Sequence, residues 1–578
     1  MSLELKPRPE KKGRTIVFVT FESEFAPLGG LAAVMRALPR EMAGTGSEDC
    51  ILIAPFFREI TRCKESLYKR IQRTGLSPKV RFGGRTYDVE IWLHTDDSGF
   101  QSFLIYSPDF FQAPCDCSDP SNPRSPCNPY FNPSKPEGLL DDALFFCAAV
   151  PEVLTAIGRI RNLVLNLQDW QTANVVFTIR EKNEIVSAAC VLTLHNPYDA
   201  PIDDSDFRKI SGESTWGATV LTRALPYIEG PLNTVSEIFA KELTEETLHN
   251  AVYAPHLQDL FRTKRLLGIN NGLFAKPDFP PSAIESAEEE DVQPLLDEKR
   301  RRRRELEQAL LQKEIKGSWG RLDLSGFPGP IFFMFGRDDP RQKGYDVLAA
   351  AIRETEPGKA MYIFTPMPGD EGTDGLRFLR DLALRERPGE ILVLPFRIES
   401  DLYKNLQQGS SFLVMPSFYE PFGGATEGYA VGTPVLARAT GGLIQQVAPF
   451  TCASLSRAAR ELAVAFHGRS APATGFLFRE PWMPAGETSA DWRSILSCEY
   501  RDQMPDGDRL KSRMNIRLFS SMAREAAWTL QDATKLYTEQ QQAYGKMMFN
   551  GFKMLEAFSW DYTVREYQRV YDQVCNTF

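Results

Sequence analysis

Two carboxylates and two glycines follow a short apolar run in the C-terminal half of the chain. The run Phe412 to Met415 predicts a strand, and Glu420, Gly423, Gly424 and Glu427 come after it. Glycines let backbone N–H groups approach a ligand closely, and the start of a helix favours negative charge, so this loop suits a diphosphate. The carboxylates can accept hydrogen bonds from neutral hydroxyls. A nucleotide-sugar offers both groups, whereas a glycine pair alone would indicate an ordinary strand-to-helix turn.

The surrounding segment, residues 411–443, resembles the donor-binding motif of retaining GT-B glycosyltransferases. In that motif an acid is followed by glycine, a second acid, and the sequences GTPV and TGGL, all of which occur here. Other segments resemble glycogen and starch synthases: FESEFAPLGGLAAV (21–34), LNLQDWQTANVVF (165–177), LTLHN (192–196), NTVSEIFAKEL (233–243), GINNG (268–272), FGRDDPRQKGYDVL (335–348), TGF (474–476) and FSWDYTVREYQRVY (558–571). Their order and spacing agree over most of the chain, which therefore resembles a divergent member of the glycogen/starch synthase family.

The resemblance implies catalytic roles for four residues. Transfer of a sugar leaves negative charge on the diphosphate, and Arg337 and Lys343 match the cations that would bind it. Glu420 matches the acid that contacts the sugar hydroxyls near the reacting carbon. His195 would direct its backbone carbonyl to the anomeric carbon and its imidazole to a sugar hydroxyl. A histidine satisfied in a turn would be the simpler interpretation if Asn196 did not stand beside it.

The resemblance further implies a set of residues that bind the nucleotide-sugar. Its members are Gly29, Gly30, Asp169, Asn196, Gly423, Gly424, Glu427, Thr440, Gly441 and Gly442. The glycines would present backbone N–H groups to the sugar or the phosphates, and Glu427 would bind the ribose. Asp169 would hold a sugar hydroxyl, although an acid directly before a helix could equally be its cap.

Three positions depart from the family pattern. The first glycine loop lacks the family's lysine, because Pro27 and Leu28 lead directly to Gly29. Gln168 stands where a histidine usually precedes Asp-Trp, and Phe274 stands where an aspartate usually follows the Asn-Gly turn. These differences leave open which acceptor is used and which base the nucleotide carries.

The sequence predicts neither a cofactor nor a catalytic metal, since side-chain cations would face the phosphates. Asp204 and Asp206 form the DxD pattern of metal-dependent glycosyltransferases, but the pattern is short and common, and an acidic surface loop is the preferred interpretation. Cys115, Cys117 and Cys127 share one loop. They lack CxxC spacing and a nearby histidine, so we interpret them as reduced thiols rather than a zinc site. A disulfide between two of them would need an oxidising setting.

Composition narrows the class of protein. The 578 residues exceed a single hydrophobic core, and 43% hydrophobic with 25% charged residues is typical of a soluble globular protein. A net charge of −9 argues against a nucleic-acid partner. We interpret the basic run Arg300 to Arg304 as a solvated helix face. No signal sequence and no apolar stretch of membrane-spanning length is recognisable, so we expect a cytoplasmic protein.

Apolar segments rich in β-branched residues recur at helix-length intervals in both halves. Continuous Val, Ile and Phe runs indicate strands buried on both faces, hence parallel sheets covered by helices. We therefore expect an α/β fold of the GT-B type, with two doubly wound Rossmann-like domains facing each other across a cleft. The expected divisions are residues 1–275 for an acceptor-side domain, 276–324 for an interdomain linker or insertion, 325–554 for a nucleotide-sugar-binding domain, and 555–578 for a C-terminal helix returning to the first domain.

These expectations combine into a retaining glycosyltransferase that moves glucose from ADP-glucose or UDP-glucose to an α-glucan without a metal ion. Its partners would be a nucleotide-sugar donor and a glucan or other sugar acceptor. Two alternatives stay open. One is a GT-B enzyme with a small-molecule or other non-glucan acceptor, and the other is a non-catalytic binder of glucan or nucleotide-sugar, which the missing lysine suggests. The joint presence of Glu420, Arg337, Lys343 and His195 favours an enzyme.

Overall fold

The computed structural model describes residues 13–116, 127–131, 138–213, 215–312, 315–369, 371–398, 400–481, 488–504 and 506–575. The chain divides into two compact units. Unit 1 comprises the residues up to Gly272 together with those from Trp560 onward, and unit 2 comprises Leu273 to Ser559.

Unit 1 is built on one sheet with the strand order β11-β10-β9-β8-β1-β2-β7-β6-β3. The strands are β1 (Thr15–Val19), β2 (Asp49–Pro55), β3 (Ile71–Arg73), β6 (Glu90–Thr95), β7 (Gln101–Tyr106), β8 (Leu163–Gln168), β9 (Ala188–Leu194), β10 (Leu232–Thr234) and β11 (Leu266–Gly268), and β4 (Lys79–Phe82) pairs with β5 (Arg85–Asp88) in a separate ribbon. β1 is buried along its whole length and lies parallel to both β2 and β8. Its continuous apolar run is therefore explained by burial on both faces.

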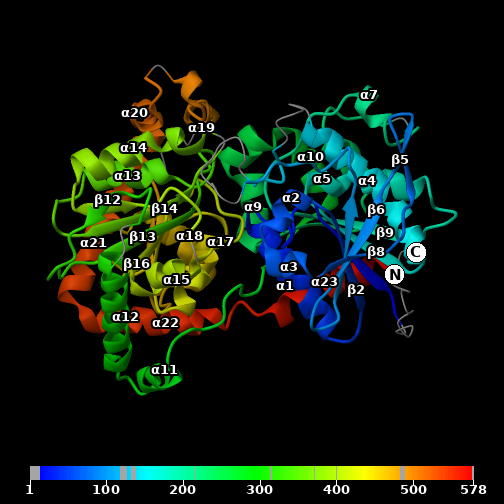
Figure 1. Ribbon diagram of the computed structural model, residues 1–578. Helices are drawn as coiled ribbons and strands as arrows, with labels where there is room; N and C mark the ends of the chain where they lie inside the picture. Colours follow the sequence, from blue (N-terminus) through cyan, green and yellow to red (C-terminus); the bar gives the residue numbers. More distant parts are fainter. Residues whose placement is uncertain are drawn as a thin grey trace. The chain divides into compact units, whose positions relative to one another are not determined.

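Eleven α-helices belong to the described part of unit 1. They are α1 (Gly30–Gly44), α2 (Arg58–Arg62), α3 (Glu65–Tyr68), α4 (Gly138–Ala156), α5 (Trp170–Ala173), α6 (Val175–Arg180), α7 (Asp204–Phe207), α8 (Val220–Ala224), α9 (Glu237–Glu245), α10 (Gln258–Lys264) and α23 (Trp560–Cys575). Although α23 is the last helix of the chain, it packs beside α1 at the other end of the sequence, as the red and blue ribbons of Figure 1 show. Thr563 Oγ1 fixes it by donating to the carbonyl of Asn270 at 2.6 Å.

Unit 2 is built on a second sheet with the strand order β12-β15-β14-β13-β16-β17-β18, in which β12 alone of these strands runs antiparallel to its neighbour. The strands are β12 (Trp319–Leu322), β13 (Ile331–Arg337), β14 (Met361–Met367), β15 (Glu390–Val393), β16 (Phe412–Met415), β17 (Val435–Arg438) and β18 (Gly475–Phe478). The helices are α11 (Pro281–Glu288), α12 (Gln293–Gln312), α13 (Tyr345–Arg353), α14 (Arg377–Asp381), α15 (Ser400–Gly409), α16 (Ala425–Ala430), α17 (Gly441–Gln446), α18 (Arg457–His467), α19 (Ser489–Leu496), α20 (Arg509–Met514), α21 (Arg517–Glu539) and α22 (Gln541–Leu555).

The predicted α/β class with two Rossmann-like sheets is confirmed, because both units are built on mainly parallel sheets connected by helices. Periodicity explains the helices that cover them. In α21, the buried residues Leu518, Met522, Ala526 and Leu530 recur every four positions and form one apolar face. No helix in the described residues has the length and apolar character needed to cross a membrane.

Residues 276–324, suggested by the sequence as a linker or insertion, carry α11, α12 and β12 and belong to unit 2. The interpretation of the basic run as a solvated face is wrong for Arg302 and Arg303, which are 5% and 9% exposed. Arg303 Nη1 donates to the carbonyl of Gly329 at 2.6 Å. Lys299, one turn earlier, is also buried and donates to the carbonyl of Gln408 at 2.8 Å. Their donors satisfy backbone carbonyls, which sequence spacing alone does not reveal.

Candidate active site

The loop between β13 and α13 carries Arg337 and Lys343, and its path depends on Gly344. This glycine has φ 68° and is the N-cap residue of α13. A Cβ atom there would lie 2.2 Å from the carbonyl oxygen of Pro416, which follows β16. Only a glycine permits this approach of the two loops at a positive φ. As a result, the end of β13 lies against the loop that carries Glu420.

Lys343 and Glu420 meet in this contact. The Nζ atom of Lys343 lies 2.8 Å from Oε2 and 3.1 Å from Oε1 of Glu420. The side chain of Glu420 is 8% exposed and that of Lys343 is 22% exposed. Ser417 Oγ also donates to Glu420 Oε2 at 3.0 Å. The structure therefore brings together the predicted cation and the predicted acid, and it adds Ser417, a partner that the sequence analysis missed.

Buried ion pairs hold the loop between Arg337 and Lys343 in place. Asp338 accepts from Arg509 at 2.7 Å, and Arg513 of α20 donates to Asp346 and to the carbonyl of Pro340, both at 2.8 Å. The desolvation of Asp338 raises its pKa, and the charge of Arg509 opposes this rise. Removing one member of such a buried pair leaves an uncompensated charge, so these arginines act as positioning residues for the loop. They lie more than a hundred and fifty residues from the loop, which is why no local motif indicates them.

Arg337 ends β13, and its Nη2 atom lies 2.9 Å from Asp339 Oδ2. Its side chain is 34% exposed. The charge of the guanidinium thus stays accessible at the carboxyl end of a parallel strand, the edge where open α/β sheets bind their ligands.

The glycine pair lies directly before α16. Gly423 has φ 89°, and a Cβ atom there would come within 2.8 Å of Leu443. Gln446 supports the loop, because its Nε2 atom donates to the carbonyl of Phe422 at 2.7 Å and its Oε1 atom accepts from Ala425 N at 3.0 Å. The sequence analysis missed Gln446, which lies three residues after the TGGL sequence. The loop is therefore held in one shape by a neutral side chain.

Glu427 lies in the first turn of α16. Desolvation of its carboxyl group raises its pKa to about 6, while a hydrogen bond with Gln407 and the charge of Lys343 oppose the rise.

Phe274, the departure after the Asn-Gly turn, packs edge to face with Phe422 at 5.9 Å between ring centroids. Where the family usually has an aspartate, this chain therefore has a phenylalanine that makes an apolar contact with the glycine loop.

The TGGL sequence closes against the backbone of Glu420. Gly442 N donates to the carbonyl of Glu420 at 2.9 Å, and a Cβ atom on Gly442 would lie 2.0 Å from the carbonyl oxygen of Phe422. Gly441 begins α17 and has φ 49°. The structure therefore places Gly442 against the backbone of Glu420 and Thr440 near the carbonyl of Phe418, and steric contact explains why Gly442 has no side chain.

A second polar cluster lies in unit 1, around Asp169. This residue has φ 57° and stands before α5, but its side chain makes no cap with the helix. Instead Oδ1 accepts from His195 N at 2.6 Å and Oδ2 accepts from Asn196 Nδ2 at 3.0 Å. The helix-cap interpretation is therefore wrong. Desolvation raises the pKa of Asp169 to about 7, and the hydrogen bond from His195 N opposes the rise.

His195 is oriented by Gln168, the residue that departs from the family pattern. Gln168 Nε2 donates to the carbonyl and to Oδ1 of Asn166, so its Oε1 must accept from His195 Nε2 at 2.7 Å. Asn166 in turn donates to Tyr571 of α23 at 2.7 Å. Burial lowers the pKa of His195 to about 3. The imidazole is therefore neutral with its proton on Nε2, and Nδ1 is the acceptor.

The first glycine loop is held by an acid that the sequence analysis did not single out. Glu22 Oε1 accepts from Leu28 N at 2.9 Å and from Gly29 N at 2.5 Å, while Oε2 accepts from Tyr130 Oη at 2.8 Å. The N–H of Gly29, predicted to bind the donor, thus already has a carboxylate partner. Gly30 begins α1, and a Cβ atom there would meet nothing within 4 Å.

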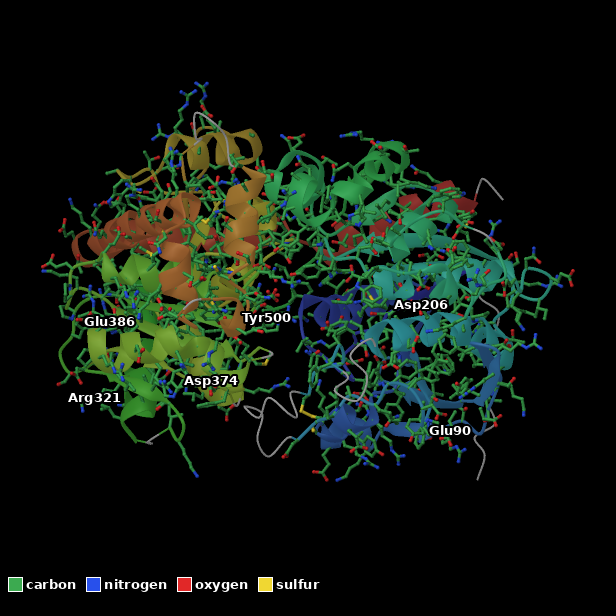
Figure 2. The ribbon with its side chains drawn as sticks, turned by 90° about the horizontal axis from the view of Figure 1, so that it is seen from above. Glu90, Asp206, Arg321, Asp374, Glu386 and Tyr500 are labelled. Carbon is green, nitrogen blue, oxygen red and sulfur yellow. A yellow bond between two sulfur atoms is a disulfide. The ribbon has the colours of Figure 1, made fainter. Side chains whose placement is uncertain are left out.

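The DxD pattern takes part in ion pairs. Asp204 pairs with Arg223 and Asp206 pairs with Lys209, each at 2.8 Å. Figure 2 labels Asp206 among the side chains of unit 1. Both carboxylates thus have side-chain cations as partners, but the two residues lie in the short helix α7 and not in the predicted loop.

Comparisons with known proteins show which proteins this chain resembles. A family model described as the starch synthase catalytic domain matches residues 15–262, and a model of family 4 glycosyltransferases in conflict systems matches residues 326–471. Glycogen synthase of Geotalea daltonii is 26% identical over 75% of this chain and 84% of its own length. Glycogen synthase of Lactiplantibacillus plantarum is 25% identical over 75% of this chain and 85% of its own length. The chain is therefore similar to glycogen synthases over three quarters of its length, and its N-terminal half is similar to the catalytic domain of starch synthases.

Solved structures agree with this similarity at the level of the fold. The catalytic domain of starch synthase IV from Arabidopsis thaliana, bound to ADP and acarbose, has a TM-score of 0.67 at 17% identity and covers 97% of this chain and 99% of its own. Sucrose-phosphate synthase from Thermosynechococcus elongatus has a TM-score of 0.52 at 14% identity, with 98% and 100% covered. The fold is therefore GT-B. Together with the curated relatives, it indicates that the chain is a glycosyltransferase.

Proposed function

We propose that the protein is a retaining glycosyltransferase that moves glucose from ADP-glucose or UDP-glucose to an α-glucan and needs no divalent metal. In this proposal unit 2 binds the nucleotide-sugar and unit 1 provides the acceptor side. The observation that carries it is the pairing of Lys343 with Glu420, at 2.8 Å, next to the strand that ends in Arg337.

This arrangement suits a donor that is anionic at one end and neutral at the other. An ammonium group has three N–H donors, so Lys343 can keep Glu420 in place and still donate to a phosphate oxygen. Arg337 adds a second positive charge at the same strand end. As the bond to the sugar breaks, negative charge grows on the diphosphate, and preorganised cations stabilise this charge without reorganisation. Glu420 would accept from the sugar hydroxyls, and Glu427 from the ribose.

The cluster in unit 1 suits the sugar rather than the phosphates. Asp169 and a neutral His195 offer hydrogen-bonding atoms with little net charge, because desolvation favours the protonated acid and the unprotonated imidazole. Neutral hydroxyls are the matching ligands. We infer that this cluster holds hydroxyl groups of the transferred sugar.

The comparisons support the substrate class. The relatives with the highest similarity reported above carry the name glycogen synthase, and the starch synthase IV structure contains ADP and acarbose. A nucleoside diphosphate and a glucan-like oligosaccharide are therefore the ligands to test first on this chain.

A donor and acceptor screen tests the proposal. The purified protein is incubated with ADP-glucose, UDP-glucose and GDP-glucose, each with and without glycogen or maltooligosaccharides, and nucleotide release is followed. We expect release from ADP-glucose or UDP-glucose that rises when glucan is added. Release that responds only to a small sugar or sugar phosphate would move the proposal to a small-molecule acceptor. Donor binding without release in any combination would overturn the catalytic proposal.

A further inference from the structure

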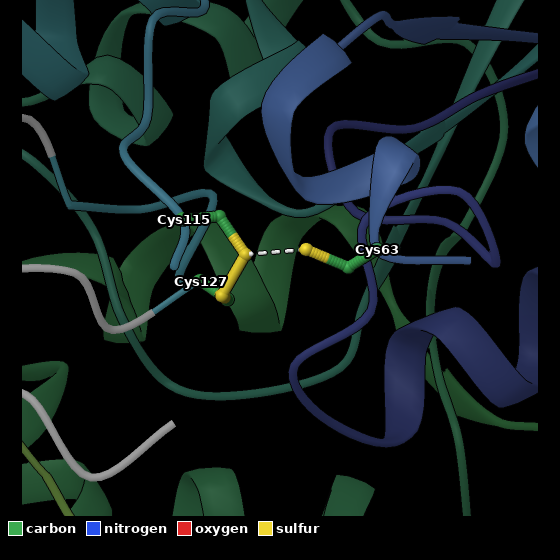
Figure 3. A group of neighbouring side chains, drawn as sticks. All are labelled: Cys63, Cys115 and Cys127. Carbon is green, nitrogen blue, oxygen red and sulfur yellow. Dashed lines mark hydrogen bonds between the residues drawn. A yellow bond between two sulfur atoms is a disulfide. The ribbon is translucent and has the colours of Figure 1, made fainter. Parts of the chain in front are cut away.

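The cysteines that follow α2 and β7 in unit 1 are disulfide-bonded. Cys115 and Cys127 form a disulfide with each other, drawn in Figure 3, and Cys63 beside them is disulfide-bonded as well. The interpretation of Cys115 and Cys127 as reduced thiols is therefore wrong, because the fold brings together two sulfurs that lie 12 positions apart in the chain. Cys117 lies outside the described residues. The three sulfurs of Figure 3 are thus all bonded and leave no thiolate for a ligand.

Unit 2 contains a buried group of charges at the ends of three neighbouring strands, β16, β17 and β18. Arg438 is the last residue of β17, Glu480 follows β18 by two residues, and each is 1% exposed. Arg438 Nε donates to Glu480 Oε2 at 3.0 Å, and its Nη2 atom pairs with Glu480 Oε1. The carboxylate therefore holds two nitrogens of the guanidinium at once, a geometry that fixes the direction of the third.

The third nitrogen of Arg438 reaches the loop that carries Glu420. Nη1 donates at 2.7 Å to the carbonyl of Phe418, which lies two residues before Glu420. Phe418 N in turn donates at 2.7 Å to the carbonyl of Gln342, the neighbour of Lys343 in the chain. The backbone of Phe418 therefore connects the lysine loop to the Glu420 loop, and Arg438 ties both to the end of β17.

The ring of Phe418 is enclosed as well. It packs edge to face against Trp492 of α19 at 5.7 Å between ring centroids, and the guanidinium of Arg513 lies 5.4 Å from its centroid. Arg438 lies 5.7 Å from the ring of Trp492. Because the ring and both backbone groups of Phe418 have buried partners, the loop cannot shift without breaking one of these contacts.

We propose that Arg438, held in place by Glu480, is a positioning residue that fixes Glu420 for sugar transfer. The inference rests on the proposed function, in which Glu420 contacts the sugar beside the breaking bond. Arg438 is too deeply buried to meet the donor, so it acts through the backbone of Phe418. A displacement of about 1 Å at a reacting group can lower a rate by roughly a hundredfold. Loss of Arg438 should therefore slow the reaction much more than it weakens nucleotide binding.

Arg438→Gln is the variant that tests this role. It removes the donor to the Phe418 carbonyl, while Glu480 keeps Arg479 as a partner at 3.2 Å, so the carboxylate is not left unpaired. Steady-state kinetics and calorimetry measure turnover and nucleotide affinity separately. We expect kcat to fall by about a hundredfold with nucleotide affinity unchanged. Arg438→Lys, whose ammonium group can still donate to Phe418 and Glu480, should recover part of the lost rate.

Arg387→Gln is the matched control, because Arg387 is also a buried arginine of unit 2 that donates to the backbone. It is 8% exposed, and its Nη2 atom donates to the carbonyls of Ile352 and Thr355 at 3.0 and 2.6 Å. Both variants lose a buried donor and should melt at a lower temperature than the original chain. Only Arg438→Gln should lose turnover, so a general loss of stability does not account for the expected difference.

Hydrogen exchange followed by mass spectrometry adds a readout that needs no reaction. Peptides covering residues 411–424 should exchange faster in Arg438→Gln than in the original chain, and at the original rate in Arg387→Gln. If the original chain turns over no donor, the proposed function fails, and exchange alone decides whether Arg438 fixes the loop. Unchanged exchange in these peptides, equal kcat in Arg438→Gln and the original chain, or equal losses of kcat in the two variants would overturn the proposal.

Discussion

The two units present polar clusters of opposite electrostatic character at the ends of their sheets. In unit 2, side chains of opposite charge lie against one another, as Lys343 and Glu420 do at 2.8 Å. In unit 1, Asp169 has a pKa raised to about 7 and His195 has a pKa lowered to about 3, so burial favours the neutral form of each. The difference supports our proposal that unit 2 binds the charged diphosphate and that unit 1 binds neutral hydroxyls.

The two glycine loops also differ in the charge of the side chain that holds them. The loop of unit 2 is held by the neutral amide of Gln446, whereas the loop of unit 1 is held by the carboxylate of Glu22. A carboxylate bound to Gly29 N repels an incoming phosphate, and the lysine that would offset this charge is absent from the loop. The similar glycine patterns of the two loops therefore do not imply similar ligands.

The largest expected effect comes from removing a cation of unit 2. Lys343→Ala and Arg337→Ala should each lower turnover by about a hundredfold to a thousandfold, the loss seen when one preorganised donor to a developing charge is removed. Steady-state kinetics with the best donor measures it. Lys359→Ala is the control, since Lys359 is 60% exposed and pairs only loosely with Glu356 at 3.6 Å. Near-normal turnover in Lys343→Ala would show that the charge of Lys343 does not stabilise the leaving diphosphate. It would thus contradict the proposed electrostatic difference between the units.

A smaller loss should follow from moving the lysine loop without removing its charge. Gly344→Ala forces a Cβ atom to within 2.2 Å of the carbonyl of Pro416, whereas Gly358→Ala, at a similar φ of 74°, meets nothing within 4 Å. Both pay the strain of a positive φ, about 1 kcal/mol. Gly344→Ala should therefore lower the melting temperature more than Gly358→Ala does. Of the two variants, it alone should lower turnover. Equal values for the two variants would show that the close approach of the loops is unimportant.

The neutral character of unit 1 predicts a pH dependence of stability. The pKa of Asp169 in the folded chain, about 7, lies above its ordinary value of about 4, so the folded state binds the proton more tightly. Its contribution to stability is therefore greatest at low pH and is lost as the pH rises through 7. As the pH rises from 5 to 8, the melting temperature of Asp169→Asn should increase relative to that of the original chain by on the order of 5 °C.

Asp97→Asn serves as the control for this experiment, because Asp97 is 95% exposed. Its melting temperature should differ from that of the original chain by the same amount at every pH. A constant offset between Asp169→Asn and the original chain from pH 5 to 8 would show that Asp169 stays ionised, and that the two clusters do not differ as described.

The smallest expected effect is that of chelation on turnover. Because side-chain cations face the phosphates in our proposal, removal of divalent metals should leave the rate unchanged. Loss of activity in a chelator with recovery in Mn²⁺ would instead support a metal-dependent donor site, with Asp204 and Asp206 as the first residues to examine.

Local sequence was sufficient for the parts of the site that lie at strand ends. The runs before Arg337, Glu420 and His195 are continuous and apolar, so their strands and the edge where they end could be predicted from burial patterns. These strands come from short stretches of chain and leave a direct pattern in the sequence. The glycines at 344 and 442 also belong to recognisable motifs, although the atoms that exclude a side chain there belong to Pro416 and Phe422, which are distant in sequence.

The rest depended on partners that are distant in sequence. Arg509 and Arg513 support the lysine loop from α20, and Tyr571 reaches Asn166 from the last helix. Their sequence neighbourhoods indicate amphipathic helices and nothing more. The burial of Arg302 and Arg303 was missed for the same reason, since a basic run predicts a solvated face unless the backbone carbonyls that it satisfies are known.

The account rests most directly on Glu420, and one comparison of binding with turnover tests it. Glu420→Gln keeps the shape of the side chain but removes the charge that faces Lys343. Nucleotide affinity is measured by calorimetry, turnover by nucleotide release, and the new linkage by the anomeric proton in NMR. We predict that Glu420→Gln retains nucleotide affinity within about tenfold while losing most of the rate, and that the original chain makes an α linkage. Unchanged turnover in Glu420→Gln, or a β-linked product, would contradict the account.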